Sequence, residues 1–288
     1  MTAADITCPI CGSAMRPTHA GYVRCCPDCG FLASTLVPEI GGGSHEHIDE
    51  AARRDSLAGL RRLSANEELD RLAKLGRSGG RLLDVGCAYG WFLAAAEARG
   101  FAALGLEPDA AVADEAEAAG LTVRRGYFPE AVADDAPFDV IVFNDVFEHI
   151  PEPDRMMRVL AERLAPGGHL VINAPSAEGI FFRIAALLER IGVAGPHARM
   201  WQKGFPSPHL SYFRPDHLAR IATAAGLVER HRSRLPALRA EGLWERLSYD
   251  RTLPIPAAGA IYVAARAMIP FLGLLPPDIR LMIFEKPA

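Results

Sequence analysis

The segment LLDVGCAYGWFLAAA, residues 82–96, constrains the fold of this 288-residue chain more than any other stretch. It is typical of an apolar strand that ends at Asp84, a turn that contains Gly86 and Gly90, and a helix that begins near Gly90. Glycine lets the backbone approach a ligand closely, and the N-terminus of a helix presents free N–H groups. This pattern predicts a nucleotide-type site at the end of a strand, although its D-x-G-x-x-x-G spacing differs from the G-x-G-x-x-G of dinucleotide enzymes.

A second apolar run ends in Leu106-Glu107-Pro108 and places a carboxylate about twenty residues beyond the glycine turn. A carboxylate in this position can accept hydrogen bonds from both hydroxyls of a ribose. Asp84 or Glu107 alone could equally be a helix cap or a solvated loop end. Their joint placement at the ends of adjacent strands favours a cofactor site.

From Arg81 onward, short apolar runs alternate with alanine-rich helical stretches, which is typical of repeated βα units. The predicted fold is α/β and Rossmann-like, with a seven-stranded, mostly parallel sheet and helices on both faces. The expected strands are 81–86, 102–106, 121–125, 138–144, 168–174, 227–232 and 281–285. The expected helices are 91–99, 110–119, 153–165 and 215–225. The stretches 177–210 and 235–278 are too long for simple loops, so we expect helical lid insertions there.

Two repeated C-P-x-C-G motifs lie near the N-terminus, Cys8-Pro-Ile-Cys11-Gly12 and Cys26-Pro-Asp-Cys29-Gly30, with fourteen residues between them. This spacing suits a hairpin that brings four thiolates around a tetrahedral zinc ion, and we predict a small zinc ribbon. The zinc is expected to be structural, because four cysteines leave no open coordination position. Cys25 and Cys87 are expected to take no part in it.

The net charge of −4 and the pI near 6.1 argue against a generally nucleic-acid-binding surface and favour a small-molecule acceptor. The N-terminus shows no secretory signal, so a cytoplasmic location is expected. The most apolar late stretch, 261–275, contains Arg266 and Pro270 and is shorter than the roughly 20 residues that span a bilayer. No transmembrane segment is expected, peripheral membrane contact is an open possibility, and the oligomeric state is open.

Five sequence blocks follow one another over about residues 70–235 and resemble the class I S-adenosylmethionine-dependent methyltransferases, especially the ubiquinone-biosynthesis O-methyltransferase branch. The blocks are LLDVGCAYG, LGLEPD, FDVIVFNDVFEHIPEP, LAERLAPGGHLVINAPS and HLSYFRPDHLARIATAAGL. Together with the cysteine motifs and the glycine run at 41–43, this predicts three units: a zinc ribbon over 1–40, a helical linker over 41–78, and a methyltransferase domain over 79–288.

The resemblance also implies roles for individual residues in binding S-adenosylmethionine. Asp84, Gly86 and Gly90 would hold the methionine portion and Glu107 the ribose, with Gly126, Tyr127 and Asn144 around the adenine or the sulfonium. The sequence departs from the family in two places: Ala88 stands where a third glycine is common, and Gly126-Tyr127 replaces an acidic residue often found after the third strand.

Methyl transfer from a sulfonium is an in-line displacement, which mainly requires a well-placed nucleophile and the exclusion of water. If the acceptor is a hydroxyl, a histidine could take its proton. His149 is the first candidate and His209 the second, although each could instead be a structural histidine that holds a loop. Glu148 and His149 could also belong to a divalent metal site, but the sequence shows no third ligand.

The stretch from His197 to Pro206 mixes cationic and aromatic side chains just before His209. Arg199, Trp201 and Lys203 could contact an anionic or ring-bearing acceptor, or Trp201 could simply pack inside a lid.

The predicted function is therefore S-adenosylmethionine-dependent methyl transfer to a small molecule, with a hydroxyl as the expected acceptor. Three alternatives stay open. A ribosomal RNA methyltransferase is disfavoured because only Arg16 and Arg24 are basic around the ribbon. A sugar C-methyltransferase shares the cysteine-rich N-terminus. A non-catalytic adaptor with a vestigial Rossmann domain is disfavoured by the complete set of predicted cofactor residues.

Overall fold

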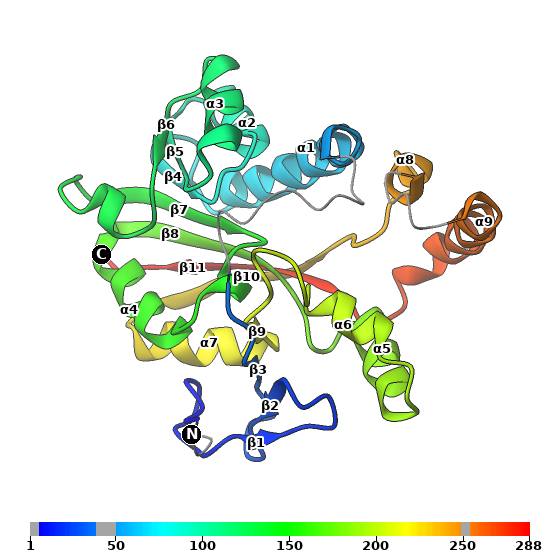
Figure 1. Cartoon of the computed structure of the whole chain (residues 1–288). Coiled ribbons are helices and arrows are strands. Elements are labelled where there is room, and N and C mark those ends of the chain that lie inside the picture. The colour runs from blue at the N-terminus through cyan, green and yellow to red at the C-terminus, as the bar shows by residue number, and fades with distance from the viewer. Residues whose placement is uncertain (1–5, 39–49, 249–253) are drawn as a thin grey trace.

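A seven-stranded sheet forms the centre of this computed structural model, which describes residues 6–38, 50–248 and 254–288 (Figure 1). The strands are β4 (Gly80–Val85), β5 (Phe101–Glu107), β6 (Val123–Arg125), β7 (Phe138–Asn144), β8 (Leu164–Pro175), β10 (Val228–Leu235) and β11 (Ile279–Glu285). Their order in the sheet is β10-β11-β8-β7-β4-β5-β6. All seven predicted strands are confirmed. The boundary predicted near residue 40 lies outside the described residues.

The order of the parallel strands reverses in the middle of the sheet, between β4 and β7. Strands β4 to β8 are parallel, whereas β11 is antiparallel to both of its neighbours, β8 and β10. The chain runs outward from β4 through β5 to β6, then returns to β7 on the other side of β4. In sheets of this type the crevice at the carboxyl ends of the two diverging strands is the usual place for a ligand. Here the crevice lies between β4 and β7.

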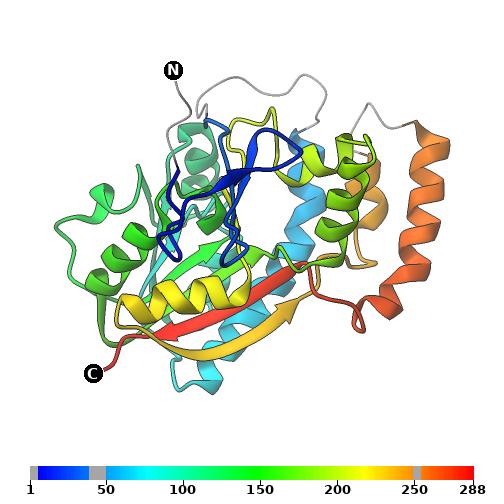
Figure 2. The ribbon, with the colours of Figure 1, turned by 90° about the horizontal axis from the view of Figure 1, so that it is seen from below.

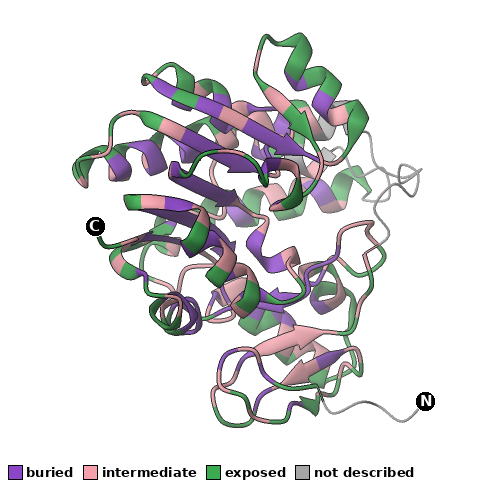
Figure 3. Ribbon diagram, turned by 90° about the vertical axis from the view of Figure 1, so that its left-hand side faces the viewer, coloured by how far each residue is buried: buried purple, intermediate pink, exposed green. Residues whose placement is uncertain are grey.

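Helices cover both faces of the sheet, because each face of a parallel sheet is apolar and must be buried. Helix α1 (Glu50–Lys74) and helix α2 (Trp91–Glu97) pack on one face. Helix α4 (Pro153–Arg163) and helix α7 (Pro215–Ala224) pack on the other, while α3 (Ala110–Ala118) lies beside β5 and β6. Figure 3 shows the central strands as buried and the outer helix surfaces as exposed.

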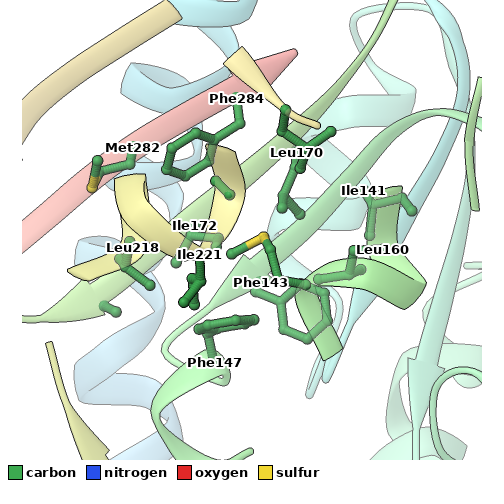
Figure 4. Packing of buried hydrophobic residues seen from close by; sticks show 14 of the residues in the cluster. Ile141, Phe143, Phe147, Leu160, Leu170, Ile172, Leu218, Ile221, Met282 and Phe284 are labelled. Carbon is green, nitrogen blue, oxygen red and sulfur yellow. The ribbon is translucent and has the colours of Figure 1, made fainter. Parts of the chain in front are cut away.

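The second face holds a dense apolar core between the sheet and the helices α4 and α7 (Figure 4). Phe143 of β7 and Phe147 meet edge to face at 5.6 Å, and both are fully buried. Leu160 of α4 and Ile221 of α7 reach the same core from the two helices. This packing fixes the end of β7, from which Asn144 and the following loop emerge.

One element boundary differs from the prediction. Helix α4 was expected to reach residue 165 and the next strand to begin at 168, but α4 ends at Arg163 and β8 begins at Leu164. Leu164 is fully buried and pairs with Phe138 across the sheet. The gain from burying this leucine explains the switch to an extended backbone before the glycine pair is reached.

Both long insertions contain helices, as expected. The first contains α5 (Ile180–Arg190) and α6 (Gly195–Met200), and the second contains α8 (Leu243–Ser248) and α9 (Ile255–Leu272). These four helices gather on the same side of the molecule in Figures 1 and 2. Within the described residues, α9 is the one helix long and apolar enough to cross a membrane by length and composition, and its apolar stretch begins six residues earlier than expected.

The N-terminal cysteine unit shares a sheet with the rest of the chain. Its strands β1 (Arg16–Pro17), β2 (Val23–Cys25) and β3 (Leu32–Ser34) are continued by β9 (Ser211–Tyr212), in the order β1-β2-β3-β9. The backbone N–H of Ser34 donates to the carbonyl of Leu210 at 2.9 Å. His217 Nε2 lies 3.0 Å from the carbonyl oxygen of Cys29. Two segments almost 180 residues apart in the sequence therefore form one small sheet.

A buried phenylalanine joins this unit to the main core. The Phe31 ring lies 5.5 Å from the ring of Phe213 and meets His217 edge-on at 5.6 Å. Phe213 in turn stacks at 5.6 Å on Phe147. The core of the cysteine unit is thus continuous with the core beneath the main sheet.

We predict that Phe31→Ala lowers the free energy of unfolding of the whole chain by about 3–5 kcal/mol, because it leaves a cavity between two packed units. Thermal unfolding followed by circular dichroism measures the effect, and Val37→Ala, at a side chain that is 76% exposed, is the control. A variant that unfolds in two separate steps, with the main step unchanged, would show that the cysteine unit folds independently.

Candidate active site

The strand register brings the predicted polar residues to one edge of the sheet. Val85 pairs with Leu106 of β5 and Phe143 of β7, so the strand-end residues Asp84, Glu107 and Asn144 lie at neighbouring carboxyl ends. Asp84 and Asn144 flank the crevice between β4 and β7. In the sequence, Asp84, Glu107 and Asn144 are each found at the end of a predicted strand. The parallel pairing of these strands in the fold brings the three residues to the same edge of the sheet.

The glycine turn after β4 requires glycine for its own geometry. Gly86 and Gly90 adopt φ angles of +71° and +75°, in the left-handed region that favours glycine. A Cβ atom would lie 2.6 Å from Val146 Cγ2 at the first position and would overlap Leu121 Cδ1 at the second. Side chains from other loops already fill this space, so the turn can close tightly over the strand ends.

Glu107 is held in place by the backbone around it. Its Oε2 accepts from the N–H of Ala88 at 3.0 Å and its Oε1 from the N–H of Asp109 at 2.9 Å. Each carboxylate oxygen has a second lone pair for a ligand hydroxyl. Burial raises the pKa of Glu107. Ala88, where a third glycine is common, adopts a positive φ of +46° without breaking this arrangement.

Gly126 and Tyr127 follow β6 on the far side of Glu107. The N–H of Gly126 donates to the carbonyl of Glu107 at 3.3 Å, so this glycine is a direct neighbour of the predicted ribose site. The Tyr127 side chain is 53% exposed and lies at the rim.

Helix α1 supplies a buried acid that sequence analysis did not identify. Glu68 is 1% exposed, and its Oε1 accepts from Asn173 Nδ2 of β8 at 3.1 Å. It shares one face of the helix with the buried Ala65, Leu69 and Leu72, at i, i+3, i+4 and i+7 spacing. An acid within an otherwise apolar face was the signal in the sequence that could have revealed it.

Several buried polar atoms at this edge have no hydrogen-bond partner. They are Glu68 Oε2, Asp84 Oδ1, Asn144 Oδ1 and Asn173 Oδ1. Unpaired buried polar atoms are costly and rare in folded proteins, so a group of four acceptors indicates a ligand site. All four are acceptors when the two acids are ionised, which suits a ligand that donates hydrogen bonds or carries positive charge.

The ionisable groups at this edge also favour a positively charged ligand. Burial and the nearby Glu107 raise the pKa of Asp84 to about 8, and burial and Asp84 raise the pKa of Glu68 to about 8. Arg61 of α1 lowers the pKa of Glu68, but it also forms an ion pair with Asp145. A cation placed between Asp84 and Glu68 would stabilise their ionised forms.

A cavity of about 220 Å³ adjoins the strand ends. Its apolar wall includes Leu60 of α1, Leu235 and Ile279, and its polar lining includes Glu148, Asn173 and His209. Asn173 lies both here and in the group of unpaired acceptors, so the two sites are contiguous. The lining mixes apolar and polar groups as small-molecule sites do, and the volume is below the usual range of about 300–1,000 Å³ for such sites.

Of the two predicted histidines, His209 lines this cavity and His149 does not. Their rings are nearly perpendicular with centroids 4.9 Å apart. His149 Nδ1 lies 2.9 Å from the carbonyl oxygen of Pro208, which leaves Nε2 as the acceptor nitrogen in the neutral ring. Burial lowers the pKa of both histidines, and that of His209 falls to about 3. Both rings are therefore neutral near pH 7.

Two groups of side chains have the composition of metal ligands. The sulfur atoms of Cys8, Cys11, Cys26 and Cys29 all lie within 4.8 Å of one another, with Cys8–Cys29 and Cys11–Cys26 separations of 3.6 and 3.3 Å. Zinc–sulfur bonds of about 2.3 Å in a tetrahedron place sulfurs about 3.7 Å apart, so this cluster fits a zinc ion.

The second group is Glu148, His149 and His209, and His209 is the third metal-ligating side chain that the sequence did not reveal. His209 joins Glu148 and His149, and one potential ligand atom from each lies within 4.8 Å of the others. Burial raises the pKa of Glu148. The three side chains could hold a divalent cation at the cavity wall.

Trp201 does not line the cavity, contrary to one of the two sequence interpretations. It is fully buried against Phe182 and Tyr212, and its indole N–H donates to His197 Nε2 at 3.1 Å. Lys203 Nζ lies 4.9 Å from the centre of the Tyr22 ring. Trp201 therefore packs inside the insertion, as the alternative interpretation expected, and the segment also contacts Tyr22 of the cysteine unit.

Two curated proteins that this chain resembles share one name. The chain is 29% identical over 167 residues to a ubiquinone biosynthesis O-methyltransferase of Xylella fastidiosa, covering 55% of this chain and 65% of that protein. A protein of the same name from Methylococcus capsulatus is 31% identical over 157 residues, covering 52% and 64%. The chain thus matches just under two thirds of the length of these relatives.

A solved structure supports the fold. The magnesium protoporphyrin IX methyltransferase from Synechocystis, solved with bound S-adenosylhomocysteine, has a TM-score of 0.52 at 13% identity, covering 85% of this chain and 90% of that one.

The family model described as a methyltransferase domain matches residues 57–231, which include β4 to β8, the glycine turn and both histidines. The chain belongs to this family of methyltransferase domains.

Proposed function

We propose that this protein transfers the methyl group of S-adenosylmethionine to a hydroxyl of a small molecule bound in the cavity beside His209. The observation that carries the proposal is the group of unpaired buried acceptors at the carboxyl ends of β4, β7 and β8. These acceptors adjoin a separate cavity of mixed lining, which matches a two-ligand reaction. The curated relatives named above act in ubiquinone biosynthesis, and they support an oxygen nucleophile.

The residues around the glycine turn fit the cofactor. Asp84 and Glu68 would face the positively charged methionine end, and Glu107 would bind the ribose hydroxyls. Gly126 and Tyr127 would flank the adenine, and Asn144 would lie near the sulfonium. The bound cofactor supplies an electrophilic methyl group on a positively charged sulfur.

The rest of the chemistry depends on positioning. A neutral His209 can accept a hydrogen bond from the acceptor hydroxyl, direct its oxygen toward the cofactor site and take the hydroxyl proton as the methyl group is transferred, while the apolar wall of the cavity limits water. His149, held by Pro208 and packed against His209, would orient that ring. The cysteine cluster would hold a structural zinc ion, because all four of its ligands come from the protein.

The cofactor site is tested by titrating the protein with S-adenosylmethionine in a calorimeter. We expect Asp84→Asn and Glu107→Gln each to weaken binding about 10- to 100-fold, since each removes a charge-assisted contact worth roughly 1.5–3 kcal/mol. Asp70→Asn is the matched control, because Asp70 is an exposed acid that pairs with Arg99. A folded wild-type protein that shows no binding would refute the proposal.

The affinity for S-adenosylmethionine is expected to rise with pH. The raised pKa values of Asp84 and Glu68 mean that the free protein holds protons there below about pH 8. A cationic ligand favours the ionised acids, so protons are released on binding. One released proton corresponds to about a tenfold gain in affinity per pH unit between about pH 6 and 7.5.

Glu68→Gln removes one of the two buried acids, so the gain in affinity with pH should be smaller in this variant. Calorimetry in buffers of different ionisation enthalpy counts the released protons directly. An affinity that is independent of pH in the wild type would show that these acids do not face the cofactor.

His209→Ala should lower methyl transfer by about 10²- to 10⁴-fold and leave cofactor binding unchanged, because this ring lines the acceptor cavity. The assay follows transfer of a radiolabelled methyl group from the cofactor to a panel of phenolic and other hydroxylated compounds. His231→Ala serves as a control, since His231 lies on the edge strand β10. Equal rates in wild type and His209→Ala would exclude His209 from the reaction.

A further inference from the structure

Helix α9 exposes apolar side chains around most of its circumference. Only 11% of its 18 residues are buried, and these lie on one side, at Ala258 and Ala265. The exposed fractions are 77% for Ile255, 67% for Val263 and 62% for Phe271. At about 100° per residue, these three lie about 80° apart in succession, and Ile261, which is 45% exposed, lies about 160° from Val263 on the opposite flank. A helix that is apolar all round is normally enclosed by protein or by lipid.

The connections of α9 show that it cannot span a bilayer while the main domain stays on one side. The helix is preceded by α8, which packs against α1, and six residues after its end the chain enters β11 of the central sheet. Both ends therefore return to the same body. An 18-residue helix is about 27 Å long, so it can lie along a surface with both ends attached to the domain.

Helix α5 also exposes apolar side chains and is attached to the segment at the end of α9. Asp278, just before β11, accepts from the N–H of Phe181 at 2.8 Å, and the N–H of Ile180 donates to the carbonyl of Pro276 at 3.2 Å. The start of α5 is therefore attached to the segment that follows α9. We define the apolar side by its six exposed residues, Ile184, Leu187, Ile255, Ile261, Val263 and Phe271.

The charges on these two helices contrast with those of the whole chain. Helix α9 carries Arg266 and no acidic residue, and α5 carries Arg183 and Arg190 on its exposed surface, while its one acid, Glu189, is largely buried beside His197; the whole chain has a net charge of −4. Trp244 of α8 is 40% exposed and packs edge-on against Tyr262 of α9 at 5.8 Å. Apolar side chains with nearby arginines and interfacial aromatic rings suit a surface of anionic lipid headgroups.

We propose that the apolar side of α5 and α9 docks on the surface of an anionic lipid bilayer, with α9 lying in the interfacial plane. A flat protein partner, including a second copy of this chain, would cover one flank of α9 and leave Ile261 or Val263 exposed on the other. A lipid layer encloses the exposed circumference and places the arginines among the headgroups.

The docked side is close to the acceptor cavity. Ile279, which lines the cavity, follows directly after Asp278, the residue that joins α5 to the end of α9. Docking would present the cavity to amphiphilic molecules held in the lipid layer. This consequence rests on the proposed function, whereas docking itself does not.

The test is flotation of the full chain with vesicles of phosphatidylcholine alone or mixed with phosphatidylglycerol. We expect the wild type to float with the mixed vesicles and to bind the neutral ones less. The double variant Val263→Asp/Phe271→Asp should reduce the bound fraction at least about tenfold, because it replaces two exposed apolar contacts with charge. Val37→Asp, an equally exposed valine on the cysteine unit, should bind as the wild type does.

Trp244 provides a second readout, since brominated lipids should quench its fluorescence and Trp244→Phe should remove that quenching. The proposal is overturned if the folded wild type stays in solution with both kinds of vesicle, or if the double variant floats as well as the wild type. It is also overturned if light scattering shows a dimer that the double variant dissociates. Flotation needs no cofactor, so its failure is separate from a failure of methyl transfer.

Discussion

Parallel pairing of β4 with both β5 and β7 is the constraint on which the rest of the structure depends. It aligns the carboxyl ends of three strands, and the reversal in strand order opens the crevice between β4 and β7. Asp84, Asn144 and Asn173 each have a buried, unpaired side-chain oxygen at this edge. The apolar core under the sheet stabilises this arrangement, which would otherwise cost free energy.

The cysteine unit is attached directly to the acceptor side of this site. Strand β3 pairs with β9, and Ser34 Oγ donates to the carbonyl of His209 at 2.8 Å. The next residue, Leu210, donates its N–H to the carbonyl of Glu148 at 2.8 Å. The segment that carries His209 is therefore held between the cysteine unit and the loop after β7. The N-terminal unit therefore has a structural role, because it holds in place a segment that forms one wall of the cavity.

Much of the main sheet could be predicted because its signals are local. Each strand is a short apolar run, and the glycine turn has a spacing that few other structures require. The end of α4 could not be predicted in this way, because burial of Leu164 against Phe138 outweighs the helical tendency of the preceding residues. The sequence analysis did not identify Glu68 as a site residue, because a glutamate in an amphipathic helix is normally expected on the solvent face, whereas Glu68 lies on the buried face of α1. Trp201 could be read in two ways until its burial was known.

Local spacing was enough to locate the four cysteines, the glycine turn and the acids Asp84 and Glu107, since each belongs to a short motif with its own geometry. The partners of Glu148 and His149 depended on folding, because His209 lies about 60 residues away and is brought to them by tertiary contacts, among them the β3–β9 pairing and the hydrogen bond from the Leu210 N–H to the Glu148 carbonyl. The exposure of α9 likewise depended on its neighbours, because an apolar helix looks the same in sequence whether protein covers it or not.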